Sequence, residues 1–470
     1  MEGIMNTLRT TALRRFLALL AVALLAASCV SNDDETSSDE PSTTTTAAAS
    51  TDTDEPSEPV EEEIVLTDSW RGVTADTINV GVSMLNFKLL VDLGLSPAGW
   101  GDQQAVWEAL IANLNDNGGI NGRMVNASYD SYSPIDPADA ERVCTALTQD
   151  FESFAVLGGF VGPASPADIC VTGTNETIMV GGEIAGNELE ESKVPWFHSS
   201  ATVDYATTNL LNLLEQTGRT EGALVFTIGG SASADQEEKV LAELEARDIE
   251  VVGSAIIEAT DGDTLAQDAE LAVAFERFKS SGANTLMIFG TPSAEIRGAG
   301  AAGLSGEIAI WSNNPGGLAN LGATITDKSI ADGVLAATGA TDDEIWADPA
   351  FQEECVEPVA ARIPEADFRQ PSTYEAEDEN WFNSLRRYCH ALSIFVQIAT
   401  EAGGDLTPTS FGETAYGPAF DDFYVPGLGP ASLSPEKRGA QDSLRLSVYD
   451  STLGDGGLAP LTELLDAFEG

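Results

Sequence analysis

From about residue 70 the chain alternates short apolar runs with segments of helical periodicity. The run at 78–82 has strand character, and the segment at 103–116 carries apolar residues three and four positions apart. Gly118 and Gly119 should end that helix, and Pro137 should open the next one. Further strands are predicted at 124–129, 154–158 and 178–180, and further helices at 136–149 and 167–173.

The same alternation restarts after a helix predicted at 202–217. We predict strands at 223–228, 250–257, 285–289 and 307–311, and helices at 234–246, 264–281 and 293–303. Two successive runs of strand and helix predict an α/β protein with two Rossmann-like lobes, each built on a parallel sheet covered by helices. Beyond Val334 the pattern is less periodic, with one clear helix at 381–402.

The first residues have the pattern of an export signal. Three arginines between positions 9 and 15 precede an unbroken apolar run at 16–27, which is too short to span a bilayer. The run ends in small residues and Cys29, and it resembles the lipobox of bacterial lipoproteins, although Ala26 replaces the preferred leucine. We therefore predict a signal peptide over 1–29 and a lipid on Cys29, which would anchor the exported protein to the outer face of the cell membrane or in the periplasm. An ordinary cleaved signal with an incidental cysteine is the alternative.

Residues 30–68 are rich in Ser, Thr, Pro and acidic residues. Lysine and arginine are absent between Arg15 and Arg71. Such a segment has too little apolar surface to offset its ordering entropy, so we predict a disordered, acidic linker between anchor and folded body.

The net charge narrows the possible partners. The chain has 76 acidic and 22 basic residues, giving a formal charge of −54. This balance argues against nucleic acid, which requires basic patches, and against docking on anionic lipid through side chains. Self-repulsion that keeps the chain in solution is the simplest explanation, so the charge says little about a ligand.

Four cysteines remain after Cys29, an even number that predicts two disulfides in an exported chain. Three pairings are possible. We favour Cys144 with Cys170 and Cys355 with Cys389, because each pair lies within one predicted subdomain. A zinc site is the rival, but the cysteines lack ligand spacing, and we expect neither metal nor cofactor.

Two segments resemble the branched-chain amino acid (Leu/Ile/Val) binding proteins of ABC transporters, a type I periplasmic solute-binding family. Residues 72–82, GVTADTINVGV, resemble the mature opening of that family, and 112–123, ANLNDNGGINGR, match its recurrent turn. The resemblance implies two hinge-linked lobes, 70–199 plus 333–440 and 200–332 plus 441–470, with a ligand cleft between them. It also implies a monomer that delivers a small-molecule ligand to an inner-membrane ABC permease.

Ligands of parallel sheets bind beyond the carboxyl ends of the strands. Each residue also has a structural interpretation, since Ser165 and Ser293 suit helix N-caps and the Asn313–Asn314 pair suits a turn. Phe87, Phe160 and Trp196 suit an apolar wall or the core. The strand-end rule selects as ligand-binding candidates Asn86, Phe87, Gly162, Ser165, Gly182, Glu183, Ser231, Thr291, Ser293, Asn313 and Asn314.

The candidate residues depart from those that the resemblance implies. Amino-acid binders of this kind hold the ligand carboxylate with hydroxyls and backbone N–H groups, and the ammonium with an acidic residue. Here 161–165 is poor in hydroxyls, and asparagine or Thr291 stands where the acid is expected. An unpartnered ammonium in a closed cleft is costly. An amide, urea-like compound, polyol or aromatic acid therefore fits as well as an amino acid.

The sequence has few residues in patterns suited to catalysis, so we expect that the protein is not an enzyme. The two histidines, His198 and His390, are far apart, and no nucleophile elbow, zinc-protease motif or phosphate-binding loop occurs. His198 is a possible ligand contact, and His390, beside Cys389 in a helix, is expected to be structural. A transport receptor is favoured, with a ligand sensor of the same fold or a cell-surface hydrolase as alternatives.

Overall fold

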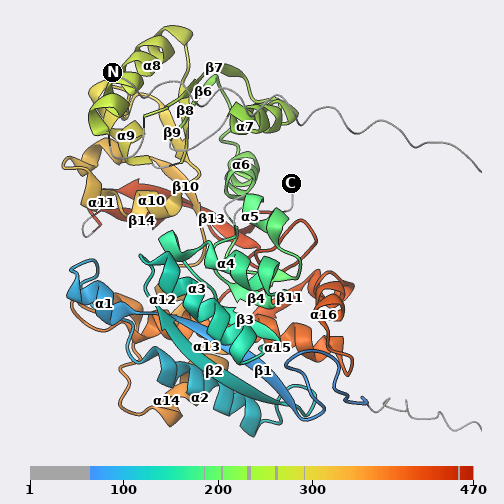
Figure 1. The fold of residues 1–470 in the computed structure, drawn as a ribbon. Coiled ribbons are helices and arrows are strands. Elements are labelled where there is room, and N and C mark those ends of the chain that lie inside the picture. Colours follow the sequence, from blue (N-terminus) through green and yellow to red (C-terminus); the bar gives the residue numbers. More distant parts are fainter. Residues whose placement is uncertain are drawn as a thin grey trace, which may run out of the picture. The chain divides into compact units, whose positions relative to one another are not determined.

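The computed structural model describes residues 64–184, 186–202, 205–229, 234–259, 263–290, 292–453 and 456–468. The expected signal peptide, Cys29 and most of the linker lie outside these ranges. None of the helices in the described ranges combines the length and apolar character that crossing a bilayer requires. Two separate sheets organise the body, which confirms the predicted two-lobed α/β class (Figure 1).

The first sheet is five-stranded and parallel, in the order β2-β1-β3-β4-β5. Its central strands are almost continuously apolar and buried, as expected for a sheet covered on both faces. Its strands are β1 (Thr77–Leu85), β2 (Met124–Tyr132), β3 (Ala155–Gly158), β4 (Ile178–Gly181) and β5 (Trp196–Phe197).

Helices cover both faces of this sheet. The long helix α15 (Trp381–Ala402) contacts β3 and β4, and α2 (Gln103–Asp116) contacts β2 and α15. Residues far apart in sequence thus form one core in this lobe, in which α16 (Pro408–Ala415) also packs on α15. We call this sheet with its helices the first lobe.

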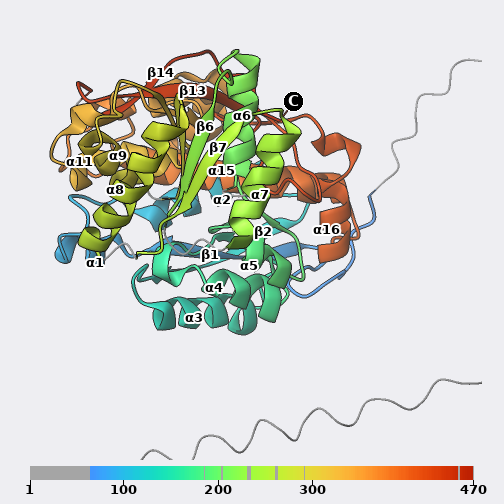
Figure 2. The same ribbon diagram turned by 90° about the horizontal axis from the view of Figure 1, so that it is seen from above.

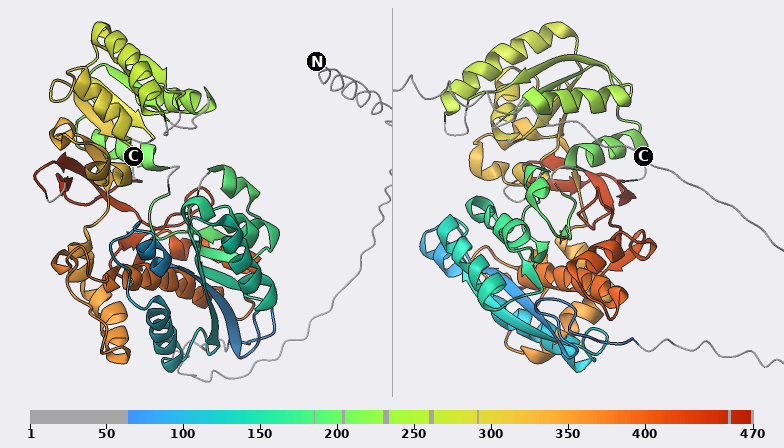
Figure 3. Two further views of the ribbon diagram at one scale, coloured as in Figure 1. Left: turned by 60° about the vertical axis from the view of Figure 1, so that its left-hand side comes forward. Right: turned by 45° about the vertical axis from the view of Figure 1, so that its right-hand side comes forward.

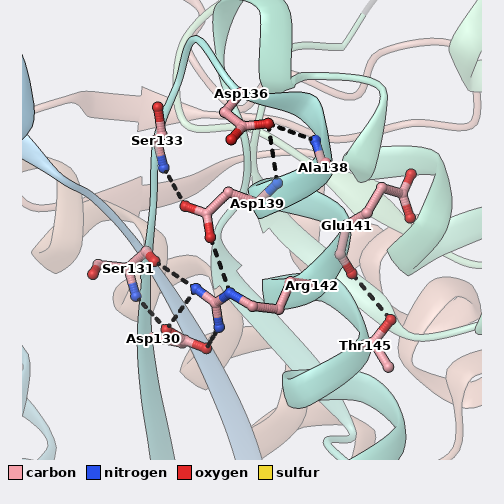
Figure 4. Close-up of polar contacts among 9 residues, drawn as sticks. All are labelled: Asp130, Ser131, Ser133, Asp136, Ala138, Asp139, Glu141, Arg142 and Thr145. Atoms are coloured by element: carbon pink, nitrogen blue, oxygen red, sulfur yellow. Dashed lines mark hydrogen bonds and ion pairs between the residues drawn. The ribbon is translucent and has the colours of Figure 1, made fainter.

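Helix α3 (Pro137–Thr145) illustrates how the sequence determines where a helix begins (Figure 4). The Asp136 carboxylate accepts hydrogen bonds from the first-turn N–H groups of Ala138 and Asp139, and Pro137 has no N–H and therefore needs no acceptor there. Arg142 then bridges Asp139 to Asp130 at the end of β2. The helix predicted to run to residue 149 ends at Thr145 and continues as a π-helix over Ala146–Asp150.

The second sheet has the order β14-β13-β10-β9-β8-β6-β7, with β15 beside β13. Its core strands β6 to β10 are parallel, whereas β13 runs antiparallel to β10. We call this sheet with its helices the second lobe. Its strands are β6 (Leu224–Ile228), β7 (Val251–Ile256), β8 (Thr285–Phe289), β9 (Ala309–Ser312), β10 (Leu335–Thr338), β13 (Ser443–Asp450), β14 (Gly457–Pro460) and β15 (Leu465–Asp466).

Helices also sandwich the second sheet. Figure 2 shows α8 (Thr264–Ser281) and α9 (Pro292–Ala301) on one side of β6 and β7, and α6 (Ala206–Gln216) and α7 (Ala234–Ala246) on the other. The C-terminal strand β14 packs against α10 (Pro315–Ala319), as Figure 3 shows for the red end of the chain beside the gold segment.

Shorter elements complete the two lobes. Beyond the strand ends and in the late part of the first lobe lie α1 (Phe87–Asp92), α4 (Ala167–Ile169), α5 (Gly186–Glu191), α12 (Asp342–Ala347), α13 (Pro349–Phe351), α14 (Glu357–Arg362), β11 (Phe423–Val425) and β12 (Gly429–Ala431). In the second lobe α11 (Leu321–Thr324) follows α10.

Two predicted boundaries need correction. The first lobe was expected to resume at residue 333, but β10 pairs with β9 and β13 in the second sheet, so the chain returns only after Thr338. The linker was expected to reach residue 68, but the Thr67 carbonyl accepts from Arg123, and Asp68 accepts from the Ala75 N–H. These hydrogen bonds hold residues before 70 against the body.

Three chain segments cross between the lobes, after β5, after β10 and before β13. Two of them are bonded to each other, because the His198 N–H donates to the Arg438 carbonyl and the Ala440 N–H donates to the His198 carbonyl. Gly439 lies between these bonds, where a Cβ would meet the Ser200 carbonyl oxygen at 2.3 Å. We call these three segments the crossovers.

The predicted disulfides are confirmed. Cys144 bonds to Cys170, which ties α3 to the segment after α4, and Cys355 bonds to Cys389 on α15. Both bonds lie in the first lobe, and no described residue of the second lobe is a cysteine.

Candidate functional site

The site is a group of three neighbouring cavities at the carboxyl ends of the strands, where the crossovers also lie. Cavity A has a volume of about 280 Å³. It is lined by strand ends of the first sheet, by one face of α15 and by all three crossovers. Its polar and aromatic lining includes Ser83, Trp100, Gln103, Tyr132, His198, Ser200, Arg386, Arg387, Tyr388, His390 and Gln441.

Arg387 is the unusual residue of cavity A. Its guanidinium stacks 4.8 Å from the ring centroid of Trp100, and among the described residues it has neither a carboxylate partner nor a hydrogen bond. The side chain is open to solvent in the cavity, yet the surrounding protein lowers its pKa by desolvation and then by the nearby charge of Arg386. Arginine stays charged, so the cavity presents a free cation.

Arg386, in contrast, is neutralised by its surroundings. It pairs with Asp342 at 3.1 Å and lies over the ring of Phe382. No described residue that lines cavity A is acidic, although acidic residues outnumber basic ones more than threefold in the chain. The cavity therefore carries about one net positive charge.

His390 lies on the same face of α15 as Arg387 and lines cavity A. It is 4% exposed, and its Nε2 has no hydrogen-bond partner among the described residues. Burial lowers its pKa to about 3, with Arg386 next in effect, and a hydrogen bond to the Pro426 backbone opposes the shift. The ring is therefore neutral near pH 7. Its expected role was structural only, whereas it also faces the cavity.

His198 lies on the first crossover and lines cavity A. Its Nδ1 accepts a hydrogen bond from the Ser200 N–H. Desolvation and then the charge of Arg387 lower its pKa to about 4, so this histidine is also neutral near pH 7. A contact between His198 and a ligand remains a prediction.

Aromatic side chains around cavity A are held in place by contacts within the protein. Tyr388 stacks on Trp107 with ring centroids 4.6 Å apart, and its hydroxyl bonds to Gln103. Tyr132 packs against buried Phe160. Preset rings of this kind lower the ordering cost of binding.

Cavity B, of about 700 Å³, adjoins cavity A and shares Leu85, Trp100, Val161, His198 and Arg387 with it. Three predicted ligand residues line it: Ser165, Gly182 and Glu183. The helix expected to open at Ser165 is only three residues of α4 before a π-helix, so it offers no extended helix start for an anion. Glu183 accepts from the N–H of Gly162, another predicted residue.

Buried Asp168 holds the loops of cavity B together. Its carboxylate accepts the N–H groups of Phe160 and Glu183, from the loops after β3 and β4. Desolvation raises its pKa, and these two bonds oppose that shift. Glycine is required beside it, because a Cβ on Gly182 would meet Asp168 Oδ2 at 2.4 Å and one on Gly159 would meet the Gly182 nitrogen at 2.1 Å.

Cavity C, of about 510 Å³, lies against the second sheet and shares Ser200, Gly339 and Gln441 with cavity A. Predicted Asn313 and Asn314 line it, but their amides are already engaged. Asn313 bonds to Thr207 and to the Gly290 N–H, and Asn314 caps α10 and donates to the Gly290 carbonyl.

Cavity C differs from cavity A in its lining. None of the described residues that line it is charged. Asn209 on α6 is fully buried and is part of its lining, and neither its Nδ2 nor its Oδ1 has a partner among the described residues. The described lining of cavity C is therefore uncharged.

The other predicted residues lie elsewhere. Asn86 caps α1, and Phe87 packs on Trp100 with ring centroids 4.4 Å apart; both line a separate pocket beside α1. Ser293 lies inside α9 and lines none of the three cavities, and Ser231 and Thr291 are outside the described residues. Phe160 and Trp196 are fully buried in the core.

No family model matches the sequence, and no curated protein matches it. Solved structures match it over most of its length. A solute-binding protein of an ABC transporter from Desulfitobacterium hafniense, in complex with Leu, is 12% identical, with a TM-score of 0.53 over 82% of this chain and 100% of its own. One from Rhodopseudomonas palustris HaA2, in complex with p-hydroxybenzoic acid, is 18% identical, with a TM-score of 0.51 over 83% and 98%.

A fatty acid ABC transporter substrate-binding protein from Thermomonospora curvata is also similar, at 16% identity and a TM-score of 0.50 over 86% of this chain and 95% of its own. The chain has the fold of type I solute-binding proteins. Within that fold, cavities A, B and C lie where the strand-end rule places ligands, and the crossovers line two of them together.

Within this type I fold, sequence reasoning missed Arg387 and Trp100, and it gave His390 a structural role only. The available signal was two adjacent arginines and a histidine in the predicted helix at 381–402, in a chain that has few basic residues. The strand-end rule selects only loops that directly follow strands, whereas Arg387 and His390 lie on α15 and Trp100 lies in the loop before α2.

Proposed function

We propose that the chain is the extracytoplasmic receptor of an ABC transport system. It captures a small molecule between its two lobes and presents it to an inner-membrane permease. The observation that carries the proposal is the set of three adjoining cavities at the strand ends, of which cavities A and C share residues of the crossovers. Closure about the crossovers would bury a ligand held on the first lobe.

The proposal includes export and anchoring. The leader at 1–29 supports export, and Cys29 supports a lipid anchor. A Cys29→Ser variant expressed in a bacterial host should lose incorporation of labelled palmitate and move from the membrane fraction to the soluble fraction. Retention of both label and membrane association in this variant would remove the anchor from the proposal.

A receptor binds without turnover, and the residues that the structure describes include no catalytic constellation in support of the hydrolase alternative. The test is a thermal-shift screen of the Cys29→Ser chain against amino acids, amides, polyols, fatty acids and aromatic acids. A ligand at roughly 100 times its dissociation constant should add about 2.7 kcal/mol to the free energy of unfolding. Mass spectrometry of the mixture should return the ligand unchanged. Absence of any stabilising compound, or formation of a product, would refute the receptor function.

A further inference from the structure

Helix α15 presents two side chains, three residues apart, to the same cavity. Residues at this spacing share one face of a helix. Arg387 and His390 both line cavity A, and their neighbours Arg386 and Tyr388 complete that wall. The pair therefore offers a ligand two different polar groups within a short distance.

Arg387 requires an anion. A guanidinium with no carboxylate partner among the described residues is suited to a carboxylate, which it binds through two parallel hydrogen bonds. The described lining of cavity A has no acidic residue, whereas Glu183 and Glu188 line the adjoining cavity B. Since Asp342 already neutralises Arg386, the cavity compensates one negative charge rather than two. A monocarboxylate fits this balance better than a phosphate dianion.

His390 requires a hydrogen-bond donor. Its Nε2 has no partner, so the bond to the Pro426 backbone belongs to the other ring nitrogen. Proline has only a carbonyl to offer, so that nitrogen carries the proton and Nε2 of the neutral ring is an acceptor. A buried acceptor without a partner is costly, which favours an occupant that donates to it.

The donor is a hydroxyl rather than an ammonium. An ammonium near Nε2 would stand beside the unpaired guanidinium of Arg387, and no acidic residue of the described lining of cavity A would balance it. Cavity C, on the other side of the crossovers, supplies no charge from its described lining either. A hydroxyl donates without adding charge.

We infer that cavity A binds a hydroxy-substituted monocarboxylic acid, whose carboxylate bonds to Arg387 and whose hydroxyl donates to His390 Nε2. This inference rests on the proposed receptor function and assigns its ligand class. It gives Arg387 and His390, rather than the strand-end hydroxyls, the main role in specificity.

The first experiment compares matched compounds on the wild-type chain by isothermal titration calorimetry. The probes are 2-, 3- and 4-hydroxybenzoate and 4-hydroxybutanoate, with benzoate lacking the hydroxyl and 4-hydroxybenzamide lacking the charge. We expect at least one hydroxy acid to bind about tenfold to a hundredfold more tightly than the amide, and about threefold to tenfold more tightly than benzoate.

The second experiment assigns each preference to a residue. Arg387→Gln should abolish the preference for acid over amide and keep the preference for hydroxybenzoate over benzoate. His390→Phe should do the reverse, and His390→Gln, which retains an acceptor, should restore part of the hydroxyl preference. The matched control is Arg277→Gln, which removes another arginine that stacks on a ring, remote from these cavities. It should leave both preferences unchanged.

The outcomes separate the two proposals. If amides, polyols or amino acids bind but the hydroxy acids do not, the ligand class is wrong and the receptor function stands. If hydroxy acids bind and the Arg387→Gln and Arg387→Lys variants keep the acid preference of the wild type, the assignment of Arg387 is refuted. If neither this panel nor the wider screen contains a ligand, both proposals fail. Because the wild-type comparison needs no variant, the inference can be tested even if Arg387→Gln misfolds.

Discussion

The two lobes meet at shared crossovers but differ in how they are held and in what they offer a ligand. The first lobe has two disulfides, and its cavity A carries an unpaired arginine and two neutral histidines. The second lobe has no described cysteine, and its cavity C has an uncharged described lining. This contrast suggests a division of work in which the first lobe selects and orients the charged end, and the second covers the rest.

The largest expected effect comes from removing a disulfide of the first lobe. Replacing Cys355 and Cys389 by serine opens a loop that spans 34 residues in sequence and should reduce the free energy of unfolding by roughly 2–5 kcal/mol. Hydrogen exchange should increase in β1, β3 and α15 and remain unchanged in β6 to β8. The Cys144→Ser, Cys170→Ser double variant is the matched control, with a similar loss in stability and less effect on α15. Equal loosening of both lobes would contradict the contrast.

The next effect is a pH dependence that belongs to the first lobe. Both histidines have folded-state pKa values below the unfolded value of about 6.5, His198 at about 4 and His390 at about 3. Their contribution to stability is therefore complete above about pH 6.5 and is lost as the pH falls toward the folded values, by up to about 1.4 kcal/mol per pH unit for each histidine.

This dependence has a clean control because the chain contains only two histidines. The His198→Gln, His390→Gln double variant should unfold thermally with a smaller loss of Tm between pH 7 and pH 5 than the wild type. The loss of Tm that remains in the double variant reports the protonation of carboxylates. An identical slope in the two proteins would show that the histidines titrate normally.

A smaller effect concerns the neutral lining of cavity C. Asn209 is buried with neither amide atom bonded to a described residue, so Asn209→Leu should stabilise the ligand-free protein by about 1 kcal/mol, since it removes an unpaired polar group. Urea denaturation measures the change, with Asn212→Leu as control. Asn212 donates to the Ala467 carbonyl, so its loss should destabilise. Destabilisation by both variants would show that Asn209 is satisfied by water.

The smallest effect tests whether Asn314 is structural or binds ligand. It caps α10 through the Gly317 N–H, so Asn314→Ala should cost about 1 kcal/mol of stability. Asn314→Asp keeps the cap and should retain that stability. If Asn314→Asp also binds the ligand of the receptor with unchanged affinity, the residue is a cap only. A loss of affinity without a loss of stability in Asn314→Asp would show that Asn314 contributes to ligand binding.

Much of the fold follows from periodicity, as the strands at 78–82, 223–228 and 285–289 show. The point at which the chain returns to the first lobe did not follow from periodicity, because a four-residue strand such as Leu335–Thr338 is identified by its partners rather than by its own pattern. Candidate site residues in loops could be selected from strand ends. Arg387 could not, because only the packing of α15 decides which face of that helix meets the cavity.

Gly439 allows the first and third crossovers to pack closely, and this affects how the crossovers bend. Hydrogen bonds join the first and third crossovers on both sides of this residue, so the two strands of backbone act as one ribbon. Bending between the lobes would then involve two connections, this ribbon and the segment at Gly339, rather than three independent ones. A single methyl group at Gly439, pressing on the Ser200 carbonyl, would stiffen or splay that ribbon and would also displace Ser200, which lines cavities A and C. Movement between the lobes and the shape of the binding cavities are therefore linked at this residue.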